Sequence, residues 1–201
     1  KTTLGAYSEK IEYELLSRIN SIKEIVCNQF QCKKNVLPPV YLLYGDLSDT
    51  QMNELYNHPK VNAMVSFTRG EGYGRPFAEW CAATDKPIIL PNWSGHLDFC
   101  KPDSVCLING QLTKIHESAV WENILIPESS WFTVNYEHGS TILKNVYDKY
   151  DYFKRKAKSQ HKHILNNYTL NHMTERLKSI LKRNIINIEK PKFIPLKLNK
   201  F

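Results

Sequence analysis

The chain has 201 residues, 42% of them hydrophobic, which is enough for one sizeable core and a short extension. No apolar stretch approaches the ~20 residues that a membrane-spanning helix needs, and the formal net charge is +7. Five cysteines without Cys-x-x-Cys spacing argue against a disulfide framework or a zinc site, and predict reduced thiols in a cytoplasmic protein.

The N-terminal quarter predicts two helices and one strand. Apolar residues recur at helical spacing over 8–28, so this segment is expected to form an amphipathic helix. Val40–Tyr44 is a run of apolar and aromatic residues that predicts a buried strand. Ser48 and Gln51 have the spacing of a capping box, which predicts a short helix through Tyr56.

The next stretch predicts a strand, a glycine-rich loop, a helix and a second strand. Val61–Phe67 and Ile88–Leu90 are the strand candidates, and a helix is expected over 77–83, with Pro76 suited to its first position. The loop has glycines at alternate positions, Gly70, Gly72 and Gly74. This order predicts a βαβ unit, in which the loop amides and the helix N-terminus together favour an anion.

A turn follows the second predicted strand. Ser94 is a good helix N-cap and predicts a short helix to about Phe99. Trp93 and His96 fit two interpretations, in which they line a binding site or pack in the core as partnered residues. Further short strands are expected at 105–108, 112–115 and 131–134.

The C-terminal part predicts helices and a tail. Apolar and aromatic residues at helical spacing indicate one long helix over 136–158 and another over 169–183. Both stripes are interpreted as core, and residues 184–201, rich in Lys and Pro, as an extended basic tail. We therefore expect an α/β fold, a Rossmann-like parallel sheet flanked by helices, in a domain over 1–183 followed by that tail.

Positive charge is concentrated at the C-terminal end. Residues 144–201 contain 15 Lys and Arg against four acidic residues, a net charge of +11, whereas residues 1–143 carry −4. A basic third of this kind could bind nucleic acid or an anionic surface, or could simply be a solvated helix face and tail. The solvated face and tail is the favoured interpretation. His161 and His163 are likewise interpreted as part of a solvated helix face, so no metal site is predicted.

Two carboxylates accompany the glycine loop. Glu71 lies within it, and Glu79 follows eight residues later, where the first turn of the helix is expected. A diphosphate needs N–H donors without side-chain bulk, which glycine provides, and sugar hydroxyls are good donors to carboxylates. The stretch therefore fits a nucleotide-sugar, with one carboxylate for each of the two sugars that flank the diphosphate.

The segment Gly70–Glu79, Gly-Glu-Gly-Tyr-Gly-Arg-Pro-Phe-Ala-Glu, resembles the Glu-x7-Glu signature of retaining glycosyltransferases with the GT-B fold, of the glycosyl transferases group 1 type. Lys86–Ile89 and the Ser94-Gly95-His96 turn extend the resemblance in the right order, as does Val40–Asp46 upstream. It covers roughly residues 40–110, and implies the C-terminal, donor-binding half of such an enzyme.

The resemblance also implies roles for individual residues. Glu71 would contact the transferred sugar and is the candidate catalytic residue, Glu79 would bind the ribose, and the amides of Gly72 and Tyr73 would face the phosphates. Arg69 and Arg75 flank the loop and are candidates for a phosphate clamp. The candidate donor-binding residues are Arg69, Gly70, Gly72, Tyr73, Gly74, Arg75, Glu79, Ser94, Gly95 and His96.

The expected donor is a nucleotide-diphosphate sugar, and the resemblance implies metal-independent transfer with retention and no bound cofactor. The acceptor-binding domain is expected before Lys1 or in a partner chain, so we expect donor binding without turnover by this chain alone. Two alternatives stay open. One is a non-catalytic nucleotide-binding α/β module, and the other is a nucleic-acid-associated, DNA-modifying protein that uses the basic C-terminal third.

Overall fold

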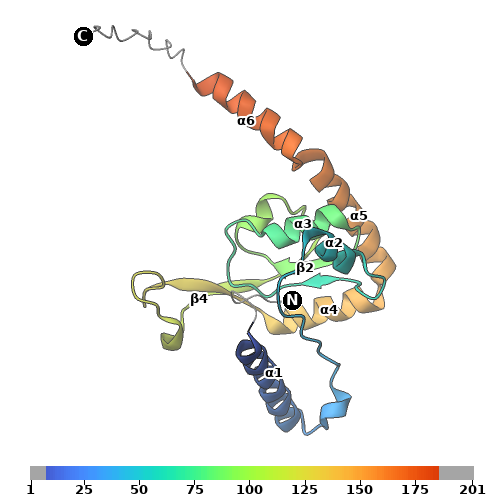
Figure 1. Cartoon of the computed structure of the whole chain (residues 1–201), viewed down its shortest axis with the longest axis vertical. Helices are drawn as coiled ribbons and strands as arrows, with labels where there is room; N and C mark the ends of the chain where they lie inside the picture. The colour runs from blue at the N-terminus through green and yellow to red at the C-terminus, as the bar shows by residue number, and fades with distance from the viewer. Residues whose placement is uncertain (1–7, 186–201) are drawn as a thin grey trace, which may run out of the picture. The chain divides into compact units, whose positions relative to one another are not determined.

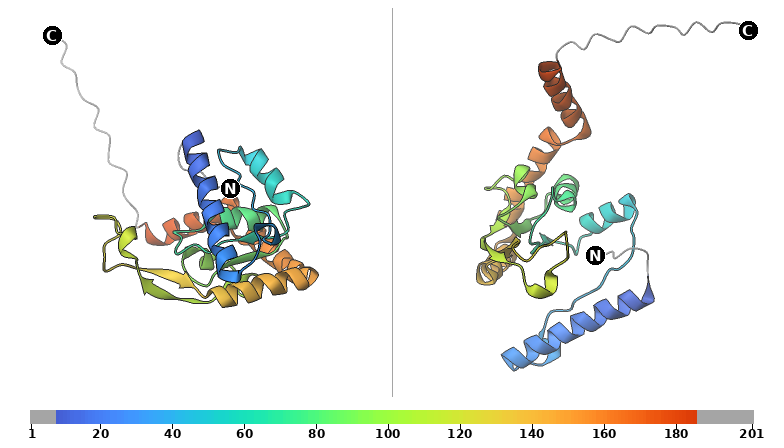
Figure 2. Two further views of the ribbon diagram at one scale, coloured as in Figure 1. Left: turned by 90° about the horizontal axis from the view of Figure 1, so that it is seen from below. Right: turned by 90° about the vertical axis from the view of Figure 1, so that its left-hand side faces the viewer.

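The computed structural model describes residues 8–185, and the chain divides into two compact units, within residues 1–55 and 56–201. Figure 1 and Figure 2 show the ribbon coloured from the N-terminus to the C-terminus. Helix α6 extends to Asn184, so the predicted tail lies outside the described residues except for its first two positions.

Two predicted helices form in the N-terminal part of the chain. Helix α1 spans Glu9–Phe30 and confirms the amphipathic helix, and a 3-10 turn, η1, follows at Lys34–Val36. Helix α2 spans Asp49–Asn57, and its capping box is present as predicted. The Ser48 amide donates to Gln51 Oε1 at 2.9 Å, and the Gln51 amide donates to Ser48 Oγ at 3.3 Å.

The predicted buried strand over 40–44 is wrong. Residues 40–43 have no regular secondary structure, and the side chains of Val40 and Tyr41 are 54% and 88% exposed. A strand is stable when neighbouring strands satisfy its N–H and C=O groups, which apolar composition alone does not guarantee.

A three-stranded parallel sheet lies at the centre of the second unit (Figure 1). Its strands are adjacent in chain order, with Met64 opposite Ile88 and Ile89 opposite Cys106. The strands are β1 at Met64–Val65, β2 at Ile88–Pro91 and β3 at Cys106–Ile108. Helix α3, Arg75–Ala83, connects β1 to β2, so the predicted βαβ unit is confirmed, although β1 is much shorter than 61–67.

Helices cover both faces of this sheet. All positions of β2 are buried, as expected for a parallel strand covered on both sides. Figure 1 shows α3 on one side of the sheet and α4, Tyr136–Asp148, on the other. Helix α5, Tyr150–Asn167, packs along α3. The predicted α/β class with a Rossmann-like sheet is therefore confirmed.

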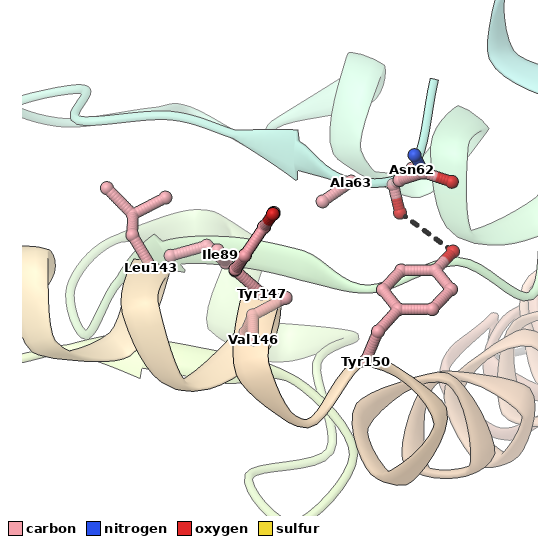
Figure 3. Close-up of a pocket in the computed structure, with 7 residues that line it drawn as sticks. All are labelled: Asn62, Ala63, Ile89, Leu143, Val146, Tyr147 and Tyr150. Carbon is pink, nitrogen blue, oxygen red and sulfur yellow. Dashed lines mark hydrogen bonds between the residues drawn. The ribbon is translucent and has the colours of Figure 1, made fainter. Parts of the chain in front are cut away.

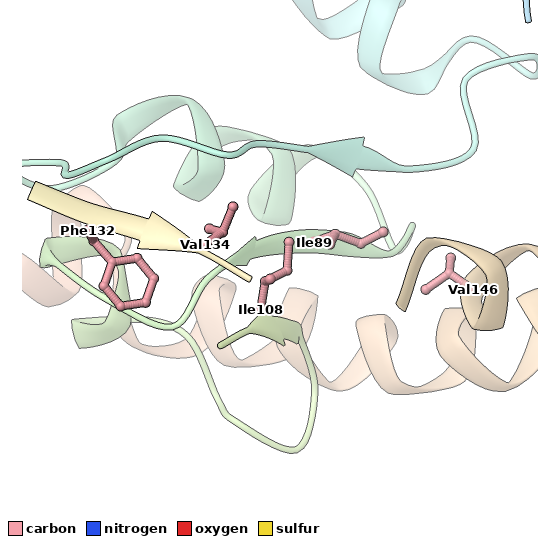
Figure 4. Packing of buried hydrophobic residues seen from close by; sticks show 5 residues of the cluster. All are labelled: Ile89, Ile108, Phe132, Val134 and Val146. Carbon is pink, nitrogen blue, oxygen red and sulfur yellow. The ribbon is translucent and has the colours of Figure 1, made fainter. Parts of the chain in front are cut away.

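An antiparallel pair of strands completes the core. Strands β4, Gly110–Lys114, and β5, Ser130–Val134, pair directly and are separated in sequence by the 3-10 turn η3, Glu117–Ala119. The predicted short strands are thus present, although their pairing with each other was not predicted. An apolar cluster joins β5 to the parallel sheet and α4 (Figure 4), through Ile89, Ile108, Phe132, Val134 and Val146.

The single helix predicted over 136–158 is wrong, because two helices, α4 and α5, occupy this stretch. The break falls at Lys149, whose backbone is not helical (φ −124°, ψ 40°). Helix α4 packs against β3 and α5 against α3, so the break lets the chain pass from one face of the sheet to the other. The Tyr150 hydroxyl fixes the start of α5 by donating to the Asn62 carbonyl oxygen at 3.1 Å (Figure 3).

Helix α6, Leu170–Asn184, confirms the last predicted helix, with Thr169 as its N-cap. Its apolar stripe was interpreted as core, and that interpretation is wrong. Leu170 is 80% exposed and Leu177 is 56% exposed, because α6 packs mainly on α5 and extends beyond the sheet (Figure 2, right). In the described part of the chain, no helix is long and apolar enough to cross a membrane.

Candidate functional site

The loops after β1 and β2 are joined at the carboxyl end of the parallel sheet. Ser94 Oγ accepts a hydrogen bond from the Glu71 amide at 2.7 Å and donates to the Glu71 carbonyl oxygen at 2.5 Å. The Gly95 amide donates to the same oxygen at 3.1 Å. Both polar groups of the Glu71 backbone are thus held by the turn after β2, and the glycine loop is fixed where open α/β sheets bind ligands.

Ser94 does not act as the predicted side-chain cap. It precedes a 3-10 turn, η2, at Gly95–Asp98, but its hydroxyl makes no capping bond and bonds the Glu71 backbone instead. Its φ of 89° lies in a region that non-glycine residues seldom adopt. The two hydrogen bonds to Glu71 stabilise this strained turn, which aims the hydroxyl at the glycine loop.

The glycine loop presents backbone donors beside a helix N-terminus. Gly74 is the N-cap of α3 and has a left-handed backbone, with φ 80°. The amides of Gly72 and Tyr73 have no acceptor among residues 8–185, and a Cβ built on Gly72 meets nothing within 4 Å. Two amides without acceptors beside the positive end of a helix form a suitable place for an anion.

The two candidate carboxylates have different surroundings. Glu71 is partly buried and its backbone is held by Ser94. Glu79 accepts a hydrogen bond from Arg75 Nε at 2.6 Å in an ion pair whose side chains are 43% and 80% exposed. The predicted position of Glu79 in the first helical turn is wrong, because α3 begins at Arg75 and places Glu79 one turn later.

The two candidate arginines lie on either side of the glycine loop, and both have partners. The Arg69 guanidinium stacks on the Trp131 ring with its Cζ 3.6 Å from the ring centroid. The Arg69 carbonyl oxygen accepts a hydrogen bond from the Phe132 amide at 3.1 Å, so the loop is attached to β5. Arg75 is paired with Glu79. Sequence analysis missed Trp131, which lies far from the loop in sequence.

His96 lies in the core, whereas Trp93 is only partly buried. The His96 side chain is fully buried, its Nε2 lies 2.7 Å from the Pro91 carbonyl oxygen, and its ring meets Phe77 edge-on. Because a carbonyl oxygen only accepts, Nε2 is the donor in this hydrogen bond, and Nδ1 has no partner in the described structure. Trp93 is 42% exposed and stacks on Phe132.

Two hollows of the second unit lie near the sheet. One, of about 540 Å³, includes Tyr73 of the glycine loop and Asp98 of η2, together with Tyr168 and one face of α6. The other, of about 420 Å³, is mainly apolar and is lined by Asn62, Ala63 and side chains of α4 (Figure 3). Asn62 and Ala63 precede β1, so this second hollow lies at the opposite end of the sheet from the glycine loop.

The histidines considered as metal ligands have separate structural partners. His161 Nδ1 lies 2.9 Å from the Cys81 carbonyl oxygen, whereas the His163 ring contacts Tyr168. Over residues 8–185, no group of three metal-ligating side chains comes together. The five cysteines are free thiols.

Comparison of the chain with models of known protein families found no match, and comparison with curated proteins found none. The chemistry of the loops at the carboxyl end of the sheet is therefore the basis on which a function can be inferred.

Proposed function

We propose that this chain is the donor-binding domain of a glycosyltransferase, and that it binds a nucleotide-diphosphate sugar for transfer with retention. The observation that carries the proposal is the clamp between Ser94 and the Glu71 backbone, which joins two loops at the ligand-binding edge of a parallel sheet. The resemblance of Gly70–Glu79 to the Glu-x7-Glu signature supplies the class of ligand.

The diphosphate would rest on the amides of Gly72 and Tyr73, at the N-terminus of α3. Backbone donors and the helix dipole are fixed before the ligand arrives, so they stabilise the charge that develops on the leaving diphosphate without reorganisation. Gly72 leaves room for close approach, because no described atom outside its two chain neighbours lies within 4 Å of where its Cβ would be.

The two sugars would use the two carboxylates. Glu71 would hold the transferred sugar, since its backbone is fixed in the loop beside the phosphate donors. Glu79 would exchange Arg75 for the ribose hydroxyls. The Arg75–Glu79 pair is largely exposed, and such pairs contribute only about 0–1 kcal/mol, so a ligand can displace it. The displaced guanidinium would then be available to the diphosphate.

The acceptor would be bound outside these loops. The parallel sheet and the glycine loop supply groups for the donor alone, and the resembled enzymes place the acceptor on a second Rossmann-like domain. We infer that this chain works together with such a domain or with a partner chain.

Calorimetric titration of the full chain with UDP-sugars and GDP-sugars tests the proposal. We expect one of the two classes to bind, and Glu79→Ala to weaken that binding about tenfold or more through loss of charge-assisted hydrogen bonds. Glu175→Ala is the matched control, because Glu175 is also an exposed helical carboxylate with a cationic partner, Lys178, at 2.6 Å.

The results separate the parts of the proposal. Equal binding by the wild-type chain and Glu79→Ala would reject the ribose assignment. Absence of binding to any nucleotide-sugar by the wild-type chain would reject the donor-domain proposal itself. An equal loss in Glu79→Ala and Glu175→Ala would show that the effect is one of overall charge rather than of the site.

A further inference from the structure

Helix α6 carries an exposed apolar stripe. Five of its side chains recur at helical spacing and are between 43% and 80% exposed, namely Leu170, Met173, Leu177, Ile180 and Leu181. On a helix this spacing places them on one face. An apolar face of this length that stays exposed on a folded domain indicates an interaction surface rather than a core element.

Cations border the stripe on both sides. In helical projection, Arg176 and Arg183 lie along one edge and Lys178 lies along the other, while Lys182 lies on the polar face. Glu175 is the acidic residue of the helix and lies on the opposite, polar face. The neighbouring helix α5 adds exposed basic side chains, so α5 and α6 together contain nine Lys and Arg against two Asp and Glu.

We propose that α6 docks on an anionic lipid bilayer, with its apolar stripe in the headgroup–acyl boundary and its cations on the lipid headgroups. A helix with an apolar face and a basic polar face binds membranes in this way, since burial of the stripe and attraction to anionic lipid add together. This inference goes beyond the proposed function and does not depend on it.

Charge and apolarity together favour a bilayer over other partners. Nucleic acid would attract the cations but would leave the stripe of Leu177 and Ile180 exposed to water. A second copy of α6 would bring two helices of net positive charge together, which disfavours a dimer through this face. A bilayer with anionic lipid can bury the apolar stripe and also bind the cations beside it.

Docking would bring the glycine loop close to the lipid. Tyr73 of that loop lines the same hollow of about 540 Å³ as Met173 and Leu177 of α6. A bilayer in contact with the α6 stripe would therefore lie beside the loop whose amides face the proposed ligand, and a lipid-anchored molecule could reach this region from the membrane.

Vesicle co-sedimentation of the full chain tests the proposal, with phosphatidylcholine vesicles compared with vesicles that also contain phosphatidylserine. We expect the chain to sediment with the anionic vesicles and not with the neutral ones. Leu177→Gln combined with Ile180→Gln keeps every charge and should weaken binding about tenfold or more, since two apolar side chains no longer enter the bilayer. Circular dichroism would confirm that this variant is folded.

Helix α1 offers a matched control. Leu16 and Ile22 are 43% and 58% exposed, but α1 carries four Glu against three Lys and Arg. Leu16→Gln with Ile22→Gln should leave vesicle binding unchanged. Failure to sediment with anionic vesicles, or equal binding by the α6 variant and the wild-type chain, would overturn the proposal. Salt-dependent DNA binding that is indifferent to the α6 variant, without vesicle binding, would make nucleic acid the partner instead.

Discussion

Gly72 and Gly95 lie in contact, but glycine is required at each for a different reason. A Cβ built on Gly95 would lie 2.0 Å from the Gly72 carbonyl oxygen, so the turn after β2 can approach the glycine loop only without a side chain there. A Cβ on Gly72 would meet nothing within 4 Å. The fold therefore needs glycine at 95, whereas at 72 the requirement comes from the proposed ligand.

Gly72→Ala should leave the stability of the chain unchanged and weaken nucleotide-sugar binding. The added methyl group has space in the protein, and the φ of Gly72 is not in the left-handed region. It would stand where a phosphate approaches the amide, and we expect affinity to fall several-fold. Calorimetry measures the change in affinity, and thermal unfolding of the same sample measures the change in stability. Unchanged affinity would show that the diphosphate does not bind at this amide.

Gly95→Ala should destabilise the chain by about 1–3 kcal/mol, the usual cost of overpacking a tightly packed contact. The methyl group would force the turn away from the Gly72 carbonyl and would disturb the Ser94–Glu71 hydrogen bonds. Urea unfolding followed by circular dichroism measures the change. Stability equal to that of Gly72→Ala would contradict the close approach described above.

Sequence analysis identified most residues of the glycine loop but not the contacts that hold it. Gly70, Gly72 and Gly74 stand out by their spacing, and the anion-binding geometry follows from local rules. The clamp between Ser94 and Glu71 joins residues 23 positions apart, and the Arg69–Trp131 stack joins two separate elements. Such contacts depend on how the elements pack, which local propensity does not determine.

Helix α5 is attached to the turn after β2 by one buried amide side chain. Gln160 is 1% exposed, and its Nε2 donates to the Phe99 carbonyl oxygen at 2.8 Å. Its Oε1 accepts from the Lys101 amide, also at 2.8 Å. One side chain thus satisfies two backbone groups at the end of η2, and holds α5 in register with the segment that leads to β3.

Gln160→Leu should destabilise the chain by about 2 kcal/mol or more, because leucine fills similar space but leaves the buried Phe99 C=O and the partly buried Lys101 N–H without partners. Chemical unfolding gives the magnitude. Gln111→Leu is the comparison, since Gln111 is exposed on β4 and such substitutions usually change stability by less than about 0.5 kcal/mol. A similar effect of both substitutions would refute the role of Gln160.

At the scale of elements, sequence rules worked best where the structure is local. The capping box at Ser48 was correctly placed before α2, because a cap depends on residues within one turn. The strand over 40–44 and the unbroken helix over 136–158 failed. A strand needs a partner, and the break at Lys149 serves the passage of the chain between two faces of the sheet.

Three buried thiols make the stability of the folded chain depend on pH. Burial raises the pKa of the Cys100 thiol to about 12 and that of Cys106 to about 11, from an ordinary value of 9.0. Burial also raises the pKa of Cys81. These thiols stay protonated in the folded chain at pH values where they ionise in the unfolded chain, so the folded state loses stability as pH rises above 9.

The free energy of unfolding should therefore fall between about pH 9 and about pH 12, with the contribution of Cys100 fully present below pH 9. Cys100→Ala has no thiol to ionise, and should lose less stability over the same range even though its stability at neutral pH is lower. Urea unfolding at a series of pH values measures both slopes. Identical slopes would show that ionisation of Cys100 does not contribute.

The stack of Arg69 on Trp131 gives the molecule a built-in optical probe. The emission of an indole depends on the charge and the water around it, and here a cation attached to the glycine loop lies 3.6 Å from the ring centroid. Any rearrangement of that loop that lifts the guanidinium would alter the fluorescence of Trp131. Events at the loop thus become visible in the ultraviolet without a label, at a residue outside the set expected to touch the donor.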